Sequence, residues 1–372
     1  MTSSARSVVV GMDATPLLGV RTGVGESVAG FIAVVAADPD LDVVGYGLSA
    51  TAGDALPEQL PTSVRAGRRI PIPAGALLWT WARFDHPAVE RWTGPVDVVH
   101  GTNFVVPPSR KAARLVTVHD LTPVRFPELC RGTSLRYPDL IRRAIRGGAS
   151  IHTVSQSVAD DVIEHFHIER DRVYVIHNGL TPLPPPVRRE DAEPPYVLAM
   201  GTVEPRKGLP DLVAAFDRIA DSLPDIRLKI AGPPGWGEEA LAATLRSARH
   251  RERIQRIGWS DDRSSLIAGA RLLAYPSLYE GFGLPPLEAM SLGVPVVATS
   301  AGAIPEVVGD AAALVAPRDV PALAEALLMV AEDATTRERL IALGAERVRL
   351  FSWQRAGQQL AHLYRTLSGF RL

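Results

Sequence analysis

Short apolar runs rich in β-branched residues alternate with longer amphipathic stretches along almost the whole chain. Strands that are buried on both faces of a parallel sheet have such apolar runs, and their parallel neighbours need crossover connections that are usually helices. The alternation therefore predicts an α/β protein with doubly wound parallel sheets. The predicted strands cover residues 8–12, 43–47, 97–100, 115–118, 151–154, 173–176, 196–200, 226–231, 254–257, 271–275, 294–298 and 313–315.

A proline-rich segment divides this pattern almost in half. Residues 182–195 hold six prolines and five charged residues, so the segment is stiff, extended and unsuited to burial. A chain of 372 residues also exceeds what one hydrophobic core usually serves. We predict two Rossmann-like domains, residues 1–181 and 196–350, joined by the linker 182–195, with a final helix in 351–372 that packs back on the first domain. The two domains would face each other across a cleft.

Charge and cysteine content exclude several classes of protein. The formal net charge of -1 argues against a general nucleic-acid-binding surface. Cys130 is the only cysteine, which excludes an intramolecular disulfide and a cysteine-based zinc site and favours a cytoplasmic protein. The first apolar run is shorter than a signal peptide needs and no run is long enough to span a membrane, so we expect neither feature, although peripheral contact with the inner face of a membrane stays open.

The segment 275–290 places two carboxylates eight residues apart around a glycine-rich turn. Glu280 precedes the turn Gly-Phe-Gly, and Glu288 follows two prolines, of which Pro286 suits the first turn of a helix. This order predicts a strand, a ligand-facing loop and a helix start. Phosphate favours a helix start, and carboxylates accept hydrogen bonds from sugar and ribose hydroxyls, so the segment would fit a nucleotide sugar. A loop glutamate and a capping or solvated helix glutamate are the alternative.

Two adjacent cations follow the first strand predicted in the second domain. Arg206 and Lys207 belong to the sequence Gly-Thr-Val-Glu-Pro-Arg-Lys-Gly (201–208), between that strand and a helix. A planar guanidinium and a compact ammonium at this position could hold a diphosphate and stabilise it as a leaving group without a metal. A solvated surface pair is the alternative.

A glycine-containing segment in the first domain lies between the first strand and an apolar helix. Gly23, Val24 and Gly25 could form a loop that approaches phosphate closely, or a plain tight turn. The segment is not the dinucleotide-binding fingerprint, because Val28 stands where that motif needs glycine.

One histidine of the first domain is placed to reach a ligand. His119 ends the predicted strand 115–118, so its imidazole could donate to a sugar hydroxyl, while Asp120 could fix its tautomer or cap the next element. A structural histidine is the alternative. His100 has a similar position with fewer polar neighbours. The aspartates Asp38, Asp40 and Asp42 look like a metal-binding motif but fit a solvated loop better, and no other spacing suggests a metal site.

Two basic stretches of the first domain are rich in arginine, and one of them also contains tryptophans. Cations beside interfacial aromatic residues can dock on anionic lipid headgroups or on a phosphorylated acceptor. Solvated helix faces with snorkelling arginines are the alternative. The residues concerned are Arg65, Arg68, Arg69, Trp79, Trp81, Arg83, Arg91 and Trp92, then Arg131, Arg136, Arg142, Arg143 and Arg146.

Taken in order, these segments resemble the GT4 family of retaining glycosyltransferases, which has the two-domain GT-B fold. Four further stretches are similar to the family: Ile-His-Asn-Gly (176–179), Gly-Pro-Pro-Gly-Trp-Gly (232–237), Gly-Val-Pro-Val-Val-Ala-Thr (293–299) and Pro-Glu-Val-Val-Gly-Asp (305–310). The likeness spans nearly the whole chain, and the order of the motifs is specific. One departure is Thr202, where many members carry arginine.

The resemblance implies a role for each matching residue. His119, Arg206, Lys207 and Glu280 would be catalytic, with the two cations on the donor diphosphate, Glu280 on the donor sugar and His119 near the reacting centre. Glu288 would bind the ribose, and the base would lie near residues 257–260. No protein nucleophile and no metal would be needed. The residues that would bind the donor are Gly23, Val24, Gly25, Thr202, Arg206, Lys207, Glu280, Gly281, Phe282, Gly283, Leu284 and Glu288.

Three hypotheses follow from the sequence. The first is a retaining, metal-independent glycosyltransferase with an acceptor-binding first domain and a donor-binding second domain, which moves a hexose to a lipid or glycan acceptor. Mannose from GDP-mannose is favoured, because the Glu-Pro-Arg-Lys and Gly-Trp-Gly segments look most like members that use it. The second is a UDP-sugar-dependent transferase or a nucleotide-sugar epimerase on the same fold. The third is a nucleotide-sugar-binding scaffold protein without turnover.

Overall fold

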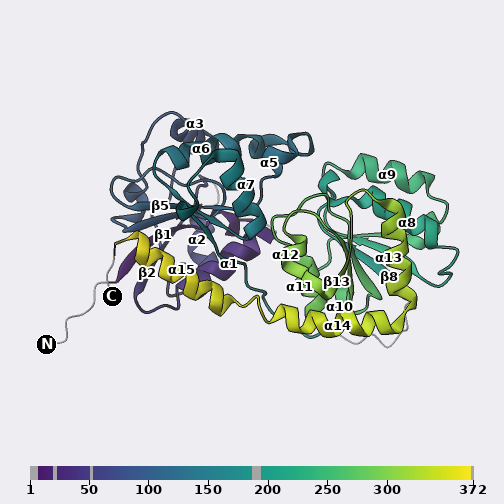
Figure 1. The fold of residues 1–372 in the computed structure, drawn as a ribbon. Coiled ribbons are helices and arrows are strands. Elements are labelled where there is room, and N and C mark those ends of the chain that lie inside the picture. The colour runs from purple at the N-terminus through teal and green to yellow at the C-terminus, as the bar shows by residue number, and fades with distance from the viewer. Residues whose placement is uncertain (1–6, 20–22, 51–52, 187–193, 370–372) are drawn as a thin grey trace. The chain divides into compact units, whose positions relative to one another are not determined.

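The computed structural model describes residues 7–19, 23–50, 53–186 and 194–369. The chain divides into two compact units, one formed by residues 1–179 with 351–372 and the other by residues 180–350. Each unit is built on a parallel sheet with helices on its faces (Figure 1). Residues 187–193 of the predicted linker lie outside the described part of the chain.

The first unit contains a seven-stranded parallel sheet in the order β3-β2-β1-β4-β5-β6-β7. In β1, Val8 and Val10 pack in one apolar cluster while Val9 packs in another, because helices cover both faces of the sheet. The strands are β1 (Val8–Asp13), β2 (Leu41–Tyr46), β3 (Arg65–Ala66), β4 (Val98–Gly101), β5 (Ala113–Val118), β6 (Ser150–Thr153) and β7 (Val173–Val175).

Helices from both ends of the chain cover this sheet. The helices of the first unit are α1 (Gly23–Val35), α2 (Leu56–Gln59), α3 (Ala74–Trp81), α4 (Glu90–Thr93), α5 (Thr122–Arg125), α6 (Tyr137–Arg146), α7 (Gln156–Phe166) and α15 (Trp353–Leu367). The C-terminal helix α15 lies beside α1 (Figure 1). Trp353 packs against the backbone of Gly30 and Gly179, where a Cβ atom would clash with its ring. The C-terminal helix is therefore part of the core of the first unit.

The aspartates near β2 have a structural role that the sequence did not indicate. Arg365 of α15 donates to Asp38 Oδ1 at 2.6 Å and to Asp40 Oδ2 at 3.1 Å. The segment is a loop, as expected, and the Asp40 side chain is 49% exposed, but the Asp38 side chain is only 20% exposed and anchors the C-terminal helix.

The second unit contains a six-stranded parallel sheet in the order β10-β9-β8-β11-β12-β13. Its strands are β8 (Tyr196–Met200), β9 (Arg227–Ala231), β10 (Ile254–Gly258), β11 (Leu272–Tyr275), β12 (Val296–Thr299) and β13 (Ala312–Val315). Its helices are α8 (Leu209–Ile219), α9 (Glu238–Ser247), α10 (Arg263–Ala268), α11 (Leu284–Ser291), α12 (Ile304–Val308), α13 (Val320–Glu332) and α14 (Ala334–Val348).

The predicted class of doubly wound parallel sheets is confirmed. All twelve predicted strands are present, with ends that differ from the prediction by at most two residues. The sequence did not predict β3, which has only two residues, both exposed. In the described residues, no helix is long and apolar enough to cross a membrane.

Candidate functional site

The strand order of the second unit reverses between β8 and β11, with β9 and β10 on one side and β12 and β13 on the other. In open α/β sheets, ligands bind at the carboxyl ends of strands where the order reverses in this way. The loop after β8 carries Arg206 and Lys207, and the loop after β11 carries Glu280. The topology thus brings three of the predicted site residues to one edge of the sheet.

These three side chains form a compact ionic group, called the Glu280 cluster below. Arg206 Nη1 forms an ion pair with Glu280 Oε2 at 2.6 Å, and Lys207 Nζ donates to Glu280 Oε1 at 2.6 Å. Arg206 also donates to the Tyr279 carbonyl at 2.9 Å, and Lys207 donates to the Tyr275 hydroxyl at 3.3 Å. The alternative interpretation of Arg206 and Lys207 as a solvated surface pair is wrong, because each of the three side chains is at most 15% exposed.

A glycine allows the two loops to meet. Arg206 and Lys207 lie in a short 3-10 turn, η6 (Pro205–Lys207), and Gly208 follows in the left-handed region with a φ of 61°. A Cβ atom on Gly208 would lie 2.1 Å from the Pro276 carbonyl oxygen, so only glycine fits there. Leu278 N also donates to the Arg206 carbonyl at 2.8 Å. These contacts fix the two cations beside Glu280.

The Glu280 carboxylate is strongly stabilised in its ionised form. Burial by itself would raise the pKa of Glu280, but the charges of Arg206 and Lys207 outweigh burial and lower that pKa to about 2. Burial lowers the pKa of Lys207, and Glu280 opposes this shift. The carboxylate is ionised at neutral pH and holds both cations in place.

The second predicted carboxylate has a partner that the sequence did not reveal. Glu288 is 7% exposed on α11, and its Oε2 accepts from Arg263 Nη2 at 2.5 Å. Arg263 begins α10, whose N-cap residue Asp262 accepts from Ser265 N at 3.0 Å. Arg263 and Glu288 belong to different helices, so the only signal for this contact in the sequence is their opposite charge. Arg263 neutralises a buried carboxylate at the same edge of the sheet.

The remaining donor-site candidates of the second unit lie in the same two loops. Phe282 is 6% exposed in the turn after Glu280, and Gly283 caps α11 with a φ of 125°. The helix begins at Leu284, so the predicted helix start with Pro286 in its first turn is confirmed. Ala303 N donates to the Glu280 carbonyl at 2.9 Å, which holds this turn from the next loop. Gly281 lies in the same turn, and Thr202 lies in the loop after β8.

His119 lies at the carboxyl end of β5 and is 8% exposed. Its Nε2 is 2.8 Å from the Thr102 carbonyl oxygen, and since a carbonyl only accepts, Nε2 carries the proton and Nδ1 has the lone pair. Burial lowers the pKa of His119, which favours the neutral ring. Asp120 Oδ1 accepts from Thr122 N at 2.8 Å, so Asp120 holds the turn that leads into α5, and Thr102 fixes the tautomer. In this tautomer Nδ1 can accept a hydrogen bond from a hydroxyl, whereas the sequence suggested that the ring would donate one.

Two other expectations for the first unit are corrected by the structure. Gly23, Val24 and Gly25 do not form a loop, because α1 begins at Gly23; residues 20–22 lie outside the described part of the chain. His100 is buried and has structural partners, since its Nδ1 is 2.6 Å from the Tyr364 hydroxyl and its Nε2 is 2.7 Å from the Thr117 hydroxyl.

The carboxyl end of β1 carries an ionisable group that the sequence did not single out. Asp13 is 2% exposed and accepts from Thr15 N at 2.9 Å. Burial raises the pKa of Asp13 to about 6, and the hydrogen bonds from Thr15 oppose the shift. The Asp13 carbonyl accepts from the Thr102 hydroxyl at 2.7 Å. Asp13 is therefore joined through Thr102 to His119.

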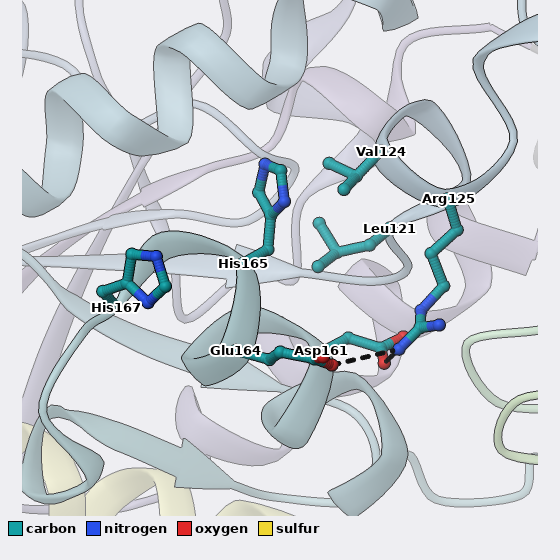
Figure 2. A pocket seen from close by; sticks show the side chains of 7 residues that line it. All are labelled: Leu121, Val124, Arg125, Asp161, Glu164, His165 and His167. Atoms are coloured by element: carbon teal, nitrogen blue, oxygen red, sulfur yellow. Dashed lines mark hydrogen bonds and ion pairs between the residues drawn. The ribbon is translucent and has the colours of Figure 1, made fainter.

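The first unit also has an open cavity of about 460 Å³ between α5 and α7. Figure 2 shows Arg125 reaching from α5 toward the carboxylates of Asp161 and Glu164 on α7, with which it forms ion pairs. None of the site residues predicted from the sequence lines it. The lining residues are Leu121, Val124, Arg125, Asp161, Glu164, His165 and His167. Across the described ranges, no group of three His, Cys, Asp or Glu side chains is arranged to hold a metal ion.

Comparison with known proteins gives two family matches. The family described as "Glycosyltransferase Family 4" matches residues 23–182, and the family described as "Glycosyl transferases group 1" matches residues 194–333. The O-antigen chain mannosyltransferase B of Escherichia coli is 32% identical over 302 residues, which cover 77% of this chain and 79% of that protein. The MMP alpha-(1->4)-mannosyltransferase of Mycolicibacterium hassiacum is 29% identical over 382 residues, which cover 87% of this chain and 91% of that protein.

A solved structure shows the same fold. The sucrose-phosphate synthase from Thermosynechococcus elongatus superposes with a TM-score of 0.76 at 21% identity, covering 98% of this chain and 100% of that one. Together with the seven- and six-stranded parallel sheets, this match shows the GT-B fold.

Proposed function

Because this chain belongs to family 4 of the group 1 glycosyltransferases, we propose that it is a retaining mannosyltransferase that moves mannose from GDP-mannose to a glycan or lipid acceptor. It is an enzyme of the hexosyltransferase type. Mannose is supported by two relatives that are named mannosyltransferases. The choice of GDP is supported by the likeness of the Glu-Pro-Arg-Lys and Gly-Trp-Gly segments to users of GDP-mannose. The observation that carries the proposal is the Glu280 cluster at the point where the strand order reverses.

In this proposal, Arg206 and Lys207 bind the donor diphosphate. An arginine has five N–H donors and a lysine has three, so each can hold Glu280 and a phosphate oxygen at the same time. Charge develops on the diphosphate as the bond to the sugar breaks, and the two cations stabilise it where it forms. Losing one such contact typically slows a reaction by about 100- to 1,000-fold. A metal ion is not required in this scheme, because the protein itself supplies the positive charge.

The remaining residues orient the donor. Glu280 accepts from a hydroxyl of the donor sugar, and the loop Gly281, Phe282, Gly283 and Leu284 follows the same sugar. Glu288 accepts from the ribose hydroxyls while Arg263 offsets its charge. His119 Nδ1 accepts from a sugar hydroxyl, in the tautomer that Thr102 fixes.

The stereochemistry follows from the lack of a protein nucleophile in this scheme. The acceptor hydroxyl attacks the oxocarbenium-like carbon on the face that the diphosphate leaves. A phosphate oxygen of the departing diphosphate takes the proton of that hydroxyl. The sugar therefore keeps its anomeric configuration.

Thermal unfolding with a panel of ligands tests the choice of donor. A ligand that binds only the native state raises the melting temperature. We expect GDP and GDP-mannose to raise it more than UDP, ADP or their sugar conjugates, with and without EDTA. A rise selective for UDP or ADP would overturn the choice of donor. No rise with any nucleotide would contradict the assigned nucleotide-sugar site, whereas a rise without any turnover would favour the scaffold protein.

A matched pair of variants places the binding site. Arg206→Met should remove the rise caused by GDP. Arg271 is the control, because it lies at the amino end of β11, away from the carboxyl ends of the strands that carry the site. Its Nε and Nη2 donate to the Ala331 carbonyl at 3.1 and 3.0 Å. Arg271→Met should keep the rise. Equal effects of the two variants would contradict the assigned site.

A further inference from the structure

Helix α3 exposes aromatic side chains that its own packing does not require. Leu77 and Trp81 are 1% and 0% exposed, and they fix the inner face of the helix in the core. On the outer side, Trp79 is 54% exposed, and Phe84 in the turn after the helix is 49% exposed. Large aromatic residues gain more from burial than most side chains, so two of them within six residues on the surface indicate an interaction site.

A cation accompanies these aromatic side chains. The Arg83 guanidinium carbon lies 4.4 Å from the centroid of the Trp79 ring, and Arg83 Nη1 donates to the Trp79 carbonyl at 3.2 Å. Arg83 is itself exposed. An indole and a guanidinium held together in this way offer an apolar plane and a positive charge at one place on the surface.

The surroundings of this pair are positively charged. Asp85 is the only acidic residue in residues 74–86, and it is bound by Arg143 at 2.6 Å and by Arg114 at 3.4 Å. Two guanidinium groups therefore meet one carboxylate. Figure 1 shows α6, which carries Arg143, close to α3.

A further arginine lies at the end of α6. A Cβ atom on Gly147 would lie 2.8 Å from Arg114 Nη1, so the preceding residue, the exposed Arg146, belongs to the same neighbourhood. The four arginines 83, 114, 143 and 146 outnumber Asp85 by three charges, on a chain whose formal net charge is -1. Positive charge is therefore concentrated around the exposed aromatic residues.

We propose that the exposed side chains of Trp79, Arg83, Phe84 and Arg146 form a surface, called the α3 surface, that docks on a bilayer containing anionic phospholipid. The side chains of Arg114 and Arg143 are only 15% exposed, and they contribute by offsetting the charge of Asp85. Tryptophan favours the headgroup region of a bilayer, and arginine binds lipid phosphate through its planar N–H groups. Positive charge complements the negative surface potential of anionic membranes. The docking itself is argued without the proposed function. Only its role, which is to bring the enzyme to an acceptor carried by a lipid, rests on the proposed function.

Co-sedimentation with lipid vesicles tests the α3 surface. We expect the full chain to bind vesicles of phosphatidylcholine with phosphatidylglycerol, and to bind pure phosphatidylcholine at least tenfold more weakly. Salt near 1 M should release the protein, because the Debye length falls to about 3 Å there. The variants Trp79→Ser and Arg83→Gln should each weaken binding by about tenfold, equal to 1.4 kcal/mol.

A matched control separates this surface from a general affinity of exposed tryptophan for lipid. Trp259 of the second unit is 53% exposed, close to the value for Trp79, and Trp259→Ser should bind vesicles like the wild type. The melting temperatures of the variants should equal that of the wild type, since both side chains are exposed. If a melting temperature falls, Phe84→Ser provides the second test of the same surface.

Several outcomes would overturn the proposal. These are no binding to anionic vesicles, equal binding to both lipids, or equal loss in the Trp79 and Trp259 variants. A surface that binds only a soluble protein partner would also overturn it. The failure of the proposed function looks different, because it appears as no thermal stabilisation by any nucleotide while vesicle binding persists.

Discussion

Removing the Glu280 carboxylate should destabilise the second unit by about 3 kcal/mol. The pKa of Glu280 lies at about 2 instead of 4.5, and each pKa unit corresponds to about 1.4 kcal/mol. A carboxyl group with a lowered pKa in the folded state stabilises that state above its unfolded pKa, and this contribution is lost as the pH falls from 4.5 toward 2. At neutral pH the full contribution is present, so Glu280→Ala removes it and leaves two cations in a largely buried site.

Urea unfolding of the wild type and Glu280→Ala at neutral pH measures this loss. Glu238→Ala is the control, because Glu238 also binds an arginine at 2.6 Å but its side chain is 39% exposed, and such pairs contribute about 0 to 1 kcal/mol. The diphosphate of GDP should replace the missing negative charge, so GDP should stabilise Glu280→Ala at least as much as the wild type, although transfer is abolished. Equal losses in the two variants would refute the energetic reasoning, and near-normal turnover of Glu280→Ala would refute the site.

Three further predictions concern other parts of the molecule. Arg263→Gln should weaken GDP binding by about tenfold, since Arg263 holds Glu288, the proposed ribose ligand. The binding of 2′,3′-dideoxy-GDP, which lacks the ribose hydroxyls and binds more weakly, should stay unchanged. Calorimetry that shows an equal loss of affinity for both ligands would contradict that role. Burial lowers the pKa of His152 to about 4 from 6.5, so the unfolded state binds the proton first, and the His152 contribution to the free energy of unfolding should fall by about 3 kcal/mol between pH 6.5 and 4. Because Asp13, whose pKa is raised to about 6, changes stability in the opposite direction, the contribution is read as the difference between the wild type and His152→Gln, and parallel pH profiles of the two would contradict it. EDTA should leave transfer unchanged, and loss of activity that added Mg²⁺ or Mn²⁺ restores would show a metal requirement.

The fold could be predicted from the sequence because its signals are local. Most strands longer than two residues have their own apolar run, as in residues 8–10, where consecutive valines pack into apolar clusters on both faces of the sheet. The edge strand β3 has no such run, since Arg65 and Ala66 are both exposed. The C-terminal helix was predicted, but its ionic anchor was not, because Arg365 and Asp38 are far apart in the sequence.

The candidate site could be predicted only as a set of positions. Parallel strands place their carboxyl ends at one edge, so Arg206, Lys207 and Glu280 could be expected there together. The sequence did not show that Glu280 binds both cations, or that Arg263 binds Glu288, because these contacts depend on how separate loops pack. The tautomer of His119 was also missed. The backbone carbonyl of Thr102 fixes it, and because every residue type has such a carbonyl, the sequence carries no signal for this contact.

The central claim is that Arg206 and Lys207 stabilise the departing nucleoside diphosphate. The most direct test is the rate at which purified protein releases GDP from GDP-mannose in the presence of EDTA, with water in place of the acceptor. The account predicts slow release by the wild type and by Arg271→Met, and a rate lower by about 100- to 1,000-fold in Lys207→Met. Equal rates in the wild type and Lys207→Met, or no release by the wild type, would contradict it.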